Sequence, residues 1–357
     1  MAQSTAQFTT RSYQSTDQPA VLELMRQSLG ETATLQRTAA MWRWKHLDSP
    51  FGPSCVRVAC GDGDKVVGMR AFMRWGFKAE GQSLRAVRAV DTATHPDYRR
   101  MGIFSRLTSQ VVEDVRSEGA HFIFNTPNND VLPGYLKLGW RQVARIHPIL
   151  KVLNYPGFSI GMARGLAHSR LARPAGRHLA PEVFFREAPT PALRLLEQRP
   201  GMERLLRQDT LSRRAGRGMH TQRSWDYLHW RYGQHPTIPY YAVFVQDNGY
   251  LQGCIIFRTN TRYGMKEVVL SEMLLAEPRE DLCDALLRRL RDSVRADYLI
   301  TYFAPESFHR AALESRGFRP VPKQGMNFTA RTLAPDLGLD PQEIASWDLV
   351  MGDLELF

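Results

Sequence analysis

Residues 95–107 read HPDYRRMGIFSRL, a proline-led turn with two arginines and a glycine directly before an amphipathic run. The pattern predicts a helix that starts near Gly102. The first turn of a helix leaves backbone N–H groups without partners and carries a partial positive charge, so it binds anions. Glycine lets the backbone approach a diphosphate closely, and Arg99 and Arg100 can add charge-assisted hydrogen bonds. The stretch predicts a phosphate-binding loop, with a solvated basic helix start as the alternative.

The composition is that of a globular protein of two ordinary domains. The chain has 357 residues, of which 43% are hydrophobic and 23% are charged. No apolar run approaches the roughly 18 residues needed to span a bilayer, and the N-terminus lacks the pattern of a secretory signal. The four cysteines show no CxxC pair and no metal-ligand spacing. We therefore expect a cytoplasmic protein with reduced, structural cysteines and no metal site.

The positive charge is concentrated in one segment. The net charge is +11, and residues 164–231 hold 14 arginines, no lysine and 6 acidic residues, a net +8. Such a segment could bind an anionic partner: an acyl carrier protein, a nucleotide sugar or a membrane surface. A solvated pair of arginine-rich helices between domains explains the same composition. No RNA- or DNA-binding motif accompanies the charge, so we do not expect nucleic acid as a partner.

The sequence repeats itself once. WKHLDSP at 44–50 recurs as WRYGQHP at 230–236. After each phrase follow a strand, a turn rich in Asp, Asn and Gly, and a second strand with a glycine. Each copy continues with another strand, a proline, a helix and an apolar strand, and closes with YLKLGWRQV (135–143) or LESRGFRPV (313–321). The shared order predicts tandem copies of one mixed α/β fold.

The first copy resembles the GNAT superfamily of acyl-CoA-dependent N-acetyltransferases. Residues 94–107 are similar to the family's pyrophosphate-loop motif Q/R-x-x-G-x-G/A, with Arg99 and Gly102 at the matching positions. NNDVLPGYLKLGW at 128–140 is similar to the family's N-x-x-A-x-x-x-Y-x-x-x-G-F, with Tyr135 in register. The resemblance implies an α/β fold of two tandem GNAT-like mixed-sheet domains, the second degenerate.

Four segments are expected along the chain. We expect a catalytic GNAT domain at 1–152, a basic inter-domain segment at 153–220, a degenerate GNAT-like domain at 221–335 and a tail at 336–357 that packs back on the protein.

The resemblance also implies acetyl-CoA, or another acyl-CoA, as the acyl donor. Tyr135 is the expected acid that protonates the departing thiolate, with a core tyrosine as the alternative. Asp91, the one acidic residue on the strand before the loop, is the expected general base, with a strand-edge aspartate as the alternative. The expected cofactor-binding residues are Thr92, Ala93, Thr94, Arg99, Arg100, Met101, Gly102, Ile103, Phe104, Ser105 and Asn128. The backbone at 92–94 is expected to pair with the pantetheine arm, and Asn128 to bind the cofactor or cap the next helix.

The second copy lacks these groups. When Pro278 is aligned with Pro96, three acidic residues fall where a diphosphate would approach: Glu280, Asp281 and Asp284. Leu313 aligns with Tyr135. Like charges repel, so we expect this copy not to bind CoA in the usual way.

The expected activity is acyl transfer from acetyl-CoA to a primary amine of a small molecule or amino sugar by direct attack. No Cys–His or Ser–His pair is evident in the sequence, which suits a mechanism without a covalent enzyme intermediate. Two alternatives stay open: a tandem ligase that uses aminoacyl-tRNA, with tRNA on the basic segment, and a non-catalytic GNAT-derived binding protein.

Overall fold

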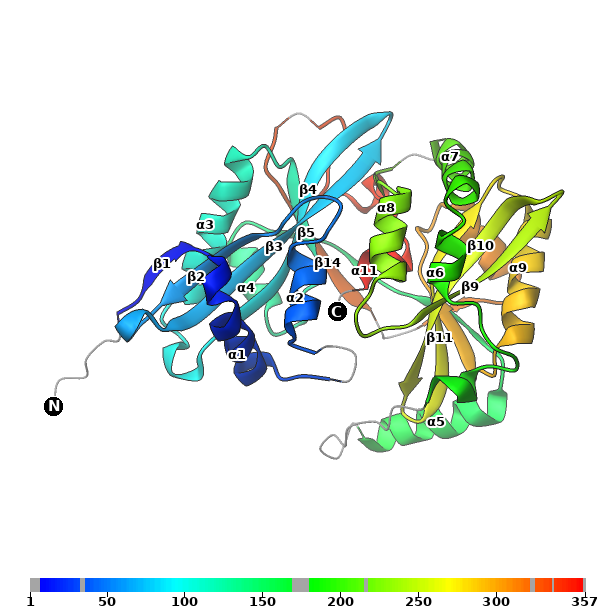
Figure 1. The fold of residues 1–357 in the computed structure, drawn as a ribbon, viewed down its shortest axis with the longest axis horizontal. Helices are drawn as coiled ribbons and strands as arrows, with labels where there is room; N and C mark the ends of the chain where they lie inside the picture. The colour runs from blue at the N-terminus through cyan, green and yellow to red at the C-terminus, as the bar shows by residue number, and fades with distance from the viewer. Residues whose placement is uncertain are drawn as a thin grey trace. The chain divides into compact units, whose positions relative to one another are not determined.

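The computed structural model describes residues 7–32, 36–168, 180–214, 218–321, 325–335 and 337–355. They form two compact units, each a mixed sheet with helices (Figure 1). The first unit holds the described residues up to Arg145 and those from Met326 to Ser346. The second holds those from Ile146 to Gly325 and from Trp347 to Glu355. The expected α/β architecture with two mixed sheets is confirmed.

The first sheet has the strand order β1-β2-β3-β4-β5-β14-β6. Its strands are β1 (Thr9–Ser12), β2 (Cys55–Cys60), β3 (Val66–Ala79), β4 (Gln82–Thr94), β5 (Phe122–Asn125), β14 (Met326–Thr332) and β6 (Arg141–Ile146). The pair β4–β5 is parallel and is joined only from Ala86↔Phe122 to Arg88↔Phe124. Beyond Arg88, β4 continues to Thr94 with no described strand on its β5 side. The two strands therefore diverge after Arg88.

Helices cover both faces of this sheet. They are α1 (Gln18–Leu29), α2 (Ala39–His46), α3 (Ile103–Ser117) and α4 (Leu132–Lys137). One apolar core joins α1 and α2 to the strands through residues such as Met25, Trp42 and Met69. A second core joins α3 and α4 to the strands through Val111, Tyr135 and other residues. The short turns of this unit are η1 (Ser15–Asp17), η2 (Asp62–Asp64), η3 (Pro96–Tyr98) and η6 (Ile344–Ser346).

The second sheet has the order β13-β7-β12-β11-β10-β9, with β11 and β12 parallel. Its strands are β13 (Arg319–Pro320), β7 (Ile149–Val152), β12 (Tyr298–Thr301), β11 (Met265–Leu275), β10 (Tyr250–Arg262) and β9 (Tyr240–Asp247). The unit's other elements are α5 (Tyr155–His168), η4 (Pro181–Phe184), α6 (Ala192–Leu196), α7 (Arg199–Arg214), β8 (His220–Thr221), α8 (Trp225–Leu228), η5 (His229–Gly233), α9 (Glu280–Ser293), α10 (Phe308–Ser315) and α11 (Met351–Leu354).

This division differs from the expected segments in two strands. β7 was assigned by sequence to the first domain, yet it pairs with β12 of the second sheet. β14 was assigned to the second domain, yet it pairs with β5 of the first sheet. Strand pairing is non-local, so the position of a strand in the sequence does not decide which sheet it joins.

The described residues of the expected basic linker, 153–220, belong to the second unit and pack within it. Apolar side chains of α6 and α7 are buried there: Leu195, Leu196, Met202, Leu205 and Leu206. Several arginines are engaged inside the unit, because Arg204 lies over the ring of Tyr250 at 4.0 Å and Arg223 forms buried ion pairs. Residues 169–179 and 215–217 lie outside the described part of the chain.

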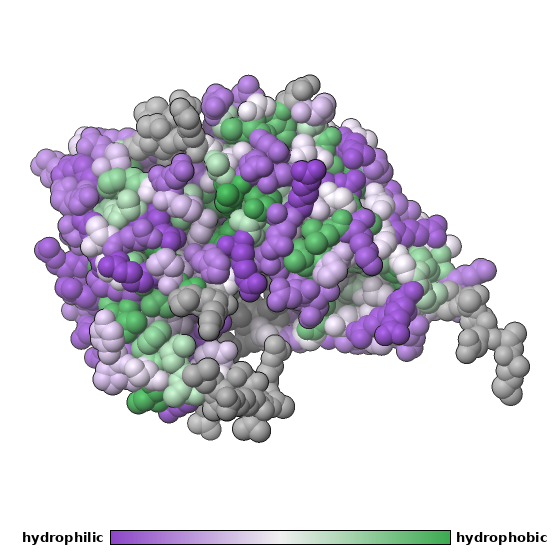
Figure 2. Space-filling view, turned by 180° about the vertical axis from the view of Figure 1, so that it is seen from behind, coloured by the Kyte–Doolittle hydropathy of each residue, from purple (hydrophilic) through white to green (hydrophobic). Residues whose placement is uncertain are grey.

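The surface seen in Figure 2 mixes hydrophilic residues with small hydrophobic groups. Among the described residues, no helix combines the length and apolarity needed to cross a membrane.

Candidate active site

The predicted phosphate loop forms a turn that leads into α3. Arg100 (φ +67°) and Gly102 (φ +81°) have left-handed backbone conformations. A Cβ on Gly102 would meet no atom within 4 Å, so the backbone angle, and not a lack of space, favours glycine there. The helix's own hydrogen bonds begin with Arg106 N–H to the Gly102 carbonyl (2.9 Å). The preceding N–H groups, of residues 103–105, make no backbone hydrogen bond within the described part of the chain.

The two arginines of the loop are not paired with a carboxylate of the described chain, although the loop contains the exposed Asp97. Arg99 and Arg100 are exposed, and no carboxylate of the described chain lies within 4.0 Å of either guanidinium. The first turn of α3 contains no acidic residue. Ile103 and Phe104 pack their side chains inward, so they could serve a ligand only through backbone N–H groups. This helix start therefore has the charge and the free donors that a diphosphate needs.

The expected strand residues lie on β4 where it has left β5. Thr92, Ala93 and Thr94 pair with β3 on one side. On the other side no described strand accompanies them, so an extended ligand can add there as a further strand. The β3–β4 register shifts between Arg70↔Thr92 and Phe72↔Ala89, which marks a β-bulge that contains Asp91.

Tyr135 on α4 is 3% exposed, and within the described part of the chain its hydroxyl has one hydrogen-bond partner. Its oxygen accepts a hydrogen bond from Arg70 Nη2 at 2.6 Å. Arg70, on β3, also donates to the carbonyl of Asp91 (3.3 Å) and lies over the rings of Phe72 and Phe104 at 4.7 and 5.7 Å. Since Arg70 is the donor, the hydroxyl hydrogen of Tyr135 is left free for another acceptor.

Arg70 was missed by the sequence analysis, although it joins the two residues predicted to carry the chemistry. Its side chain is fully buried, and no carboxylate of the described chain lies within 4.0 Å. A buried guanidinium without an anion is costly and is rarely kept for stability alone. An arginine within a strand normally indicates an exposed position, so no sequence signal distinguishes this one.

Asp91 is held by a lysine, a histidine and an arginine on the α1–α2 side of the sheet. Its carboxylate lies 2.9 Å from Lys45 Nζ, 3.0 Å from His46 Nε2 and 3.8 Å from Arg37 Nη1. Burial alone would raise the pKa of Asp91, but Lys45 and His46 together hold it well below its usual range. Asp91 is thus a fixed carboxylate with little tendency to take up a proton, which favours a positioning role over direct base catalysis.

His46 connects Asp91 to a hydroxyl group. Burial lowers the pKa of His46, so the ring is neutral at neutral pH. Its Nε2–H donates to Asp91, which leaves Nδ1 to accept from Ser54 Oγ at 3.0 Å. The sequence analysis found no Ser–His pair, and the structure corrects this. The pair escapes notice because a loop turns the chain back between α2 and β2.

Asn128 caps the turn before α4. Its side-chain oxygen accepts from the backbone N–H groups of Asp130 (3.0 Å) and Val131 (3.1 Å). This is the capping role that the sequence offered beside cofactor binding.

The second unit places different residues at the corresponding positions. Aligning the glycines of the repeated strand, Gly68 and Gly253, sets Ile255 against Arg70. Ile255 and Leu313, the residues that align with Arg70 and Tyr135, belong to one buried apolar core. The pair of polar groups is thus replaced by a pair of hydrocarbon side chains.

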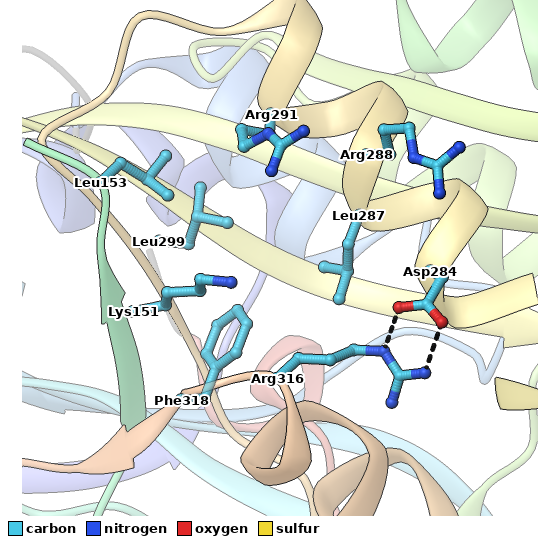
Figure 3. A pocket seen from close by; sticks show the side chains of 9 residues that line it. All are labelled: Lys151, Leu153, Asp284, Leu287, Arg288, Arg291, Leu299, Arg316 and Phe318. Carbon is cyan, nitrogen blue, oxygen red and sulfur yellow. Dashed lines mark hydrogen bonds and ion pairs between the residues drawn. The ribbon is translucent and has the colours of Figure 1, made fainter. Parts of the chain in front are cut away.

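The acidic start of α9 is neutralised by arginines. Arg279 pairs with Asp281, and Arg316 binds Asp284 through two hydrogen bonds of 2.6 and 2.8 Å (Figure 3). The expected repulsion of a diphosphate by bare carboxylates is therefore reduced. Instead, Glu280 and Asp281 complement the positive end of the helix themselves.

In the second sheet, β11 corresponds to β4. Residues 349–352, near the C-terminus, lie beside the edge of β11 that is open in β4. Val350 bridges to Phe303, just after β12, with flanking hydrogen bonds Ala304 N–H to Leu349 O (2.9 Å) and Met351 N–H to Tyr302 O (2.8 Å). A Cβ on Gly352 would lie 2.8 Å from Glu272 Oε1 and 3.0 Å from the Ser271 carbonyl. The segment thus lies between β11 and the chain that follows β12.

In both units, an aromatic side chain is hydrogen-bonded to a carboxylate at the β-bulge. In the first, His46 donates to Asp91; in the second, the Tyr232 hydroxyl donates to Glu272 at 2.9 Å. His46 and Tyr232 are the third residues of WKH and WRY in the repeated phrases. In the second unit, Arg223 further bridges Glu272 (2.9 Å) and Asp353 of the C-terminal segment (3.0 Å). Among the described residues, no group of three or more His, Cys, Asp or Glu could hold a metal ion.

The comparisons with known proteins agree with this geometry. Residues 9–143 match the model of the acetyltransferase (GNAT) domain. Similar solved structures include GCN5-related N-acetyltransferases from Anabaena variabilis (14% identity, TM-score 0.61, covering 92% of this chain and 73% of that one) and from Kribbella flavida (14%, 0.58, 92% and 72%). A conserved protein from Enterococcus faecalis, described as a probable N-acyltransferase, is also similar (12%, 0.61, 92% and 73%).

No curated protein matches the chain by sequence. At these identities the structural matches establish the fold alone, and the family assignment rests on the domain model. Residues 9–143 are a GNAT acetyltransferase domain, in a chain whose two mixed sheets share the fold of GCN5-related N-acetyltransferases.

Proposed function

We propose that the protein is an acyl-CoA-dependent N-acyltransferase that transfers an acetyl group to a primary amine of a small molecule or amino sugar. One observation carries the proposal: the buried Arg70–Tyr135 pair, with its free hydroxyl hydrogen, lies in the same unit as an anion-ready helix start. A structural domain has no need for a buried, unpaired guanidinium or for bare cations at a helix start.

Acyl-CoA fits the first unit. The N–H groups at the start of α3, with Arg99 and Arg100, would hold the diphosphate, and the unpaired edge of β4 at Thr92–Thr94 would hold the pantetheine arm. When bound, acyl-CoA supplies a thioester whose acyl group passes to the amine and whose sulfur leaves as a thiolate.

Tyr135 would provide the proton for the sulfur from its hydroxyl. Arg70 donates to the phenol oxygen, so it orients the O–H and would face the negative charge that remains once the proton has left. Tyr135 is then the general acid, and Arg70 is a positioning residue that acts through it.

Asp91 would act through His46. The fixed carboxylate holds Nε2–H and so makes Nδ1 of His46 the proton-accepting atom. The Ser54 hydroxyl donates a hydrogen bond to Nδ1 of His46. It would relay a proton from the amine to the imidazole ring. This differs from direct base catalysis by Asp91 and predicts that Ser54→Ala and Asp91→Asn both lower kcat more than they raise the KM for acetyl-CoA.

The test has two steps. Isothermal titration of acetyl-CoA should show saturable binding, and a panel of primary amines should then release free CoA thiol from acetyl-CoA. Tyr135→Phe should bind acetyl-CoA as well as the wild type and release thiol far more slowly. Absence of acetyl-CoA binding would overturn the proposal and favour aminoacyl-tRNA or a non-catalytic partner. Binding without turnover on any amine would leave the binding protein as the better explanation.

A further inference from the structure

The second unit contains a pocket with an apolar floor and a cationic rim (Figure 3). Its volume is about 190 Å³. Leu287, Leu299 and Phe318 form the floor, and the last two are almost fully buried. The rim carries Lys151 from β7 and Arg288 and Arg291 from α9. All these residues belong to the second unit, so the pocket is separate from the α3 loop.

Among the described residues, the rim cations have no strong anionic partner. Asp284, the acidic residue of the pocket, is already bound by Arg316 through two hydrogen bonds. No carboxylate of the described chain lies within 4.0 Å of Lys151 or Arg288. Arg291 has only its exposed neighbour Asp292, at 3.4 Å. Two of the three rim cations thus have no carboxylate of the described chain within 4.0 Å, and the third has an exposed one.

This crowding has a cost that a bound anion would remove. Burial, together with the charges of Arg291 and Arg316, lowers the pKa of Lys151. Figure 3 shows Lys151 extending between Leu299 and Phe318 into the pocket, with both α9 arginines above it. Neighbouring positive charges repel each other. An anion bound among them would be attracted to all three and would offset this repulsion.

We propose that this pocket binds a small organic phosphate, with the phosphate on Lys151, Arg288 and Arg291 and an apolar body against Leu287, Leu299 and Phe318. Arginine side chains match the geometry of phosphate oxygens, and a dianion suits three neighbouring cations better than a carboxylate does. A cavity of about 150 Å³ accommodates a benzene-sized group, so the apolar body is about one ring in size.

The experiment is isothermal titration of phenyl phosphate into the full chain. We expect saturable binding that weakens at least tenfold in Arg288→Glu/Arg291→Glu, and that falls steeply as salt is raised. Arg289→Glu is the matched control, because Arg289 lies on the same helix and donates to the Phe244 carbonyl instead. It should bind like the wild type. Circular dichroism would verify that each variant folds, and Lys151→Met offers a second, milder test.

Three further arms identify the ligand and the site. Inorganic phosphate and benzyl alcohol should each bind at least tenfold more weakly than phenyl phosphate, since each lacks one half of the recognition. Gly102→Asp, which alters the α3 loop, should keep phenyl phosphate binding. The proposal is overturned if phenyl phosphate does not saturate, if inorganic phosphate binds equally well, or if Gly102→Asp abolishes binding while Arg288→Glu/Arg291→Glu does not.

Discussion

Helices α3 and α9 follow corresponding long strands in two similar sheets, yet their first turns are built in opposite ways. α3 has no acidic residue in its first turn, and two exposed arginines precede it. α9 carries Glu280 and Asp281 in its first turn. A negative charge stabilises a helix start; α9 carries its own, whereas the first turn of α3 has none and can accept that of a ligand. The same element is structural in one unit and a candidate site in the other.

The interiors of the two units differ in the same sense. Arg70 and Tyr135 in the first correspond to Ile255 and Leu313 in the second. The open edge of β4 corresponds to an edge of β11 that the C-terminal segment covers. At these three places the second unit has acidic residues, apolar side chains or its own chain segment where the first unit has groups open to a ligand. Unsatisfied groups are therefore the best guide to function here.

The largest expected effect comes from giving α3 an acidic start. Gly102→Asp should weaken acetyl-CoA binding by about 1000-fold, because a like charge close to the diphosphate costs up to about 4 kcal/mol and about 1.4 kcal/mol is tenfold. Gly102→Asn is the matched control, since asparagine tolerates the left-handed backbone without charge. It should stay within tenfold of the wild type by titration. Equal losses in both variants would assign the effect to backbone conformation.

Replacing Arg70 and Tyr135 by the apolar residues of the second unit should separate their effect on catalysis from their effect on stability. Arg70→Ile/Tyr135→Leu should lower kcat at least about 100-fold, the scale of a lost general acid. Tyr135→Leu alone removes the partner of a buried guanidinium and should lower the free energy of unfolding by about 1–3 kcal/mol. The double variant should recover much of this stability, because no buried charge remains. Urea unfolding and steady-state kinetics measure both effects.

A double variant less stable than Tyr135→Leu would contradict the view that Arg70 is kept for chemistry. Retained activity in the double variant would remove Tyr135 from the mechanism.

Crowding the C-terminal segment should damage the second unit alone. Gly352→Val would push a side chain against Tyr232, Glu272 and Ser271. Overpacking of this kind costs about 1–3 kcal/mol, which should lower the calorimetric midpoint of that unit by several degrees. Acetyl-CoA affinity should not change. A loss of affinity with an unchanged midpoint would show that the segment serves the first unit's site instead.

The smallest expected effect is a pH dependence of stability that comes from the His46–Asp91 pair, because this pair contains a histidine where the second unit has Tyr232. Burial lowers the pKa of His46, so the folded state binds fewer protons than the unfolded state as pH falls below about 6.5. The stability due to neutral His46 is complete above that pH and is lost on acidification. We expect His46→Gln to reduce the fall in unfolding free energy between pH 7 and pH 5 by about 1 kcal/mol.

An unchanged slope in His46→Gln would show that folding does not lower the pKa of His46.

Local patterns in the sequence located much of the candidate site, whereas non-local contacts were out of reach. The turn before α3, the position of Tyr135 and the strand that carries Asp91 follow from short motifs and spacing, whereas the bulge in that strand does not. Arg70 could not be found, because nothing in a strand sequence shows that an arginine is buried. The Ser54–His46 contact and the exchange of β7 and β14 between sheets depend on chain paths that no periodicity encodes.

The late position of β14 in the chain affects the order of events during synthesis. β5 is complete at Asn125, but its neighbour β14 begins at Met326, about 200 residues further on. A nascent chain released from the ribosome tunnel up to residue 152 would expose the free side of β5 until β14 had emerged, after most of the second unit. The first unit therefore cannot finish folding co-translationally on its own, and chaperones would meet its unpaired strand edge for most of translation.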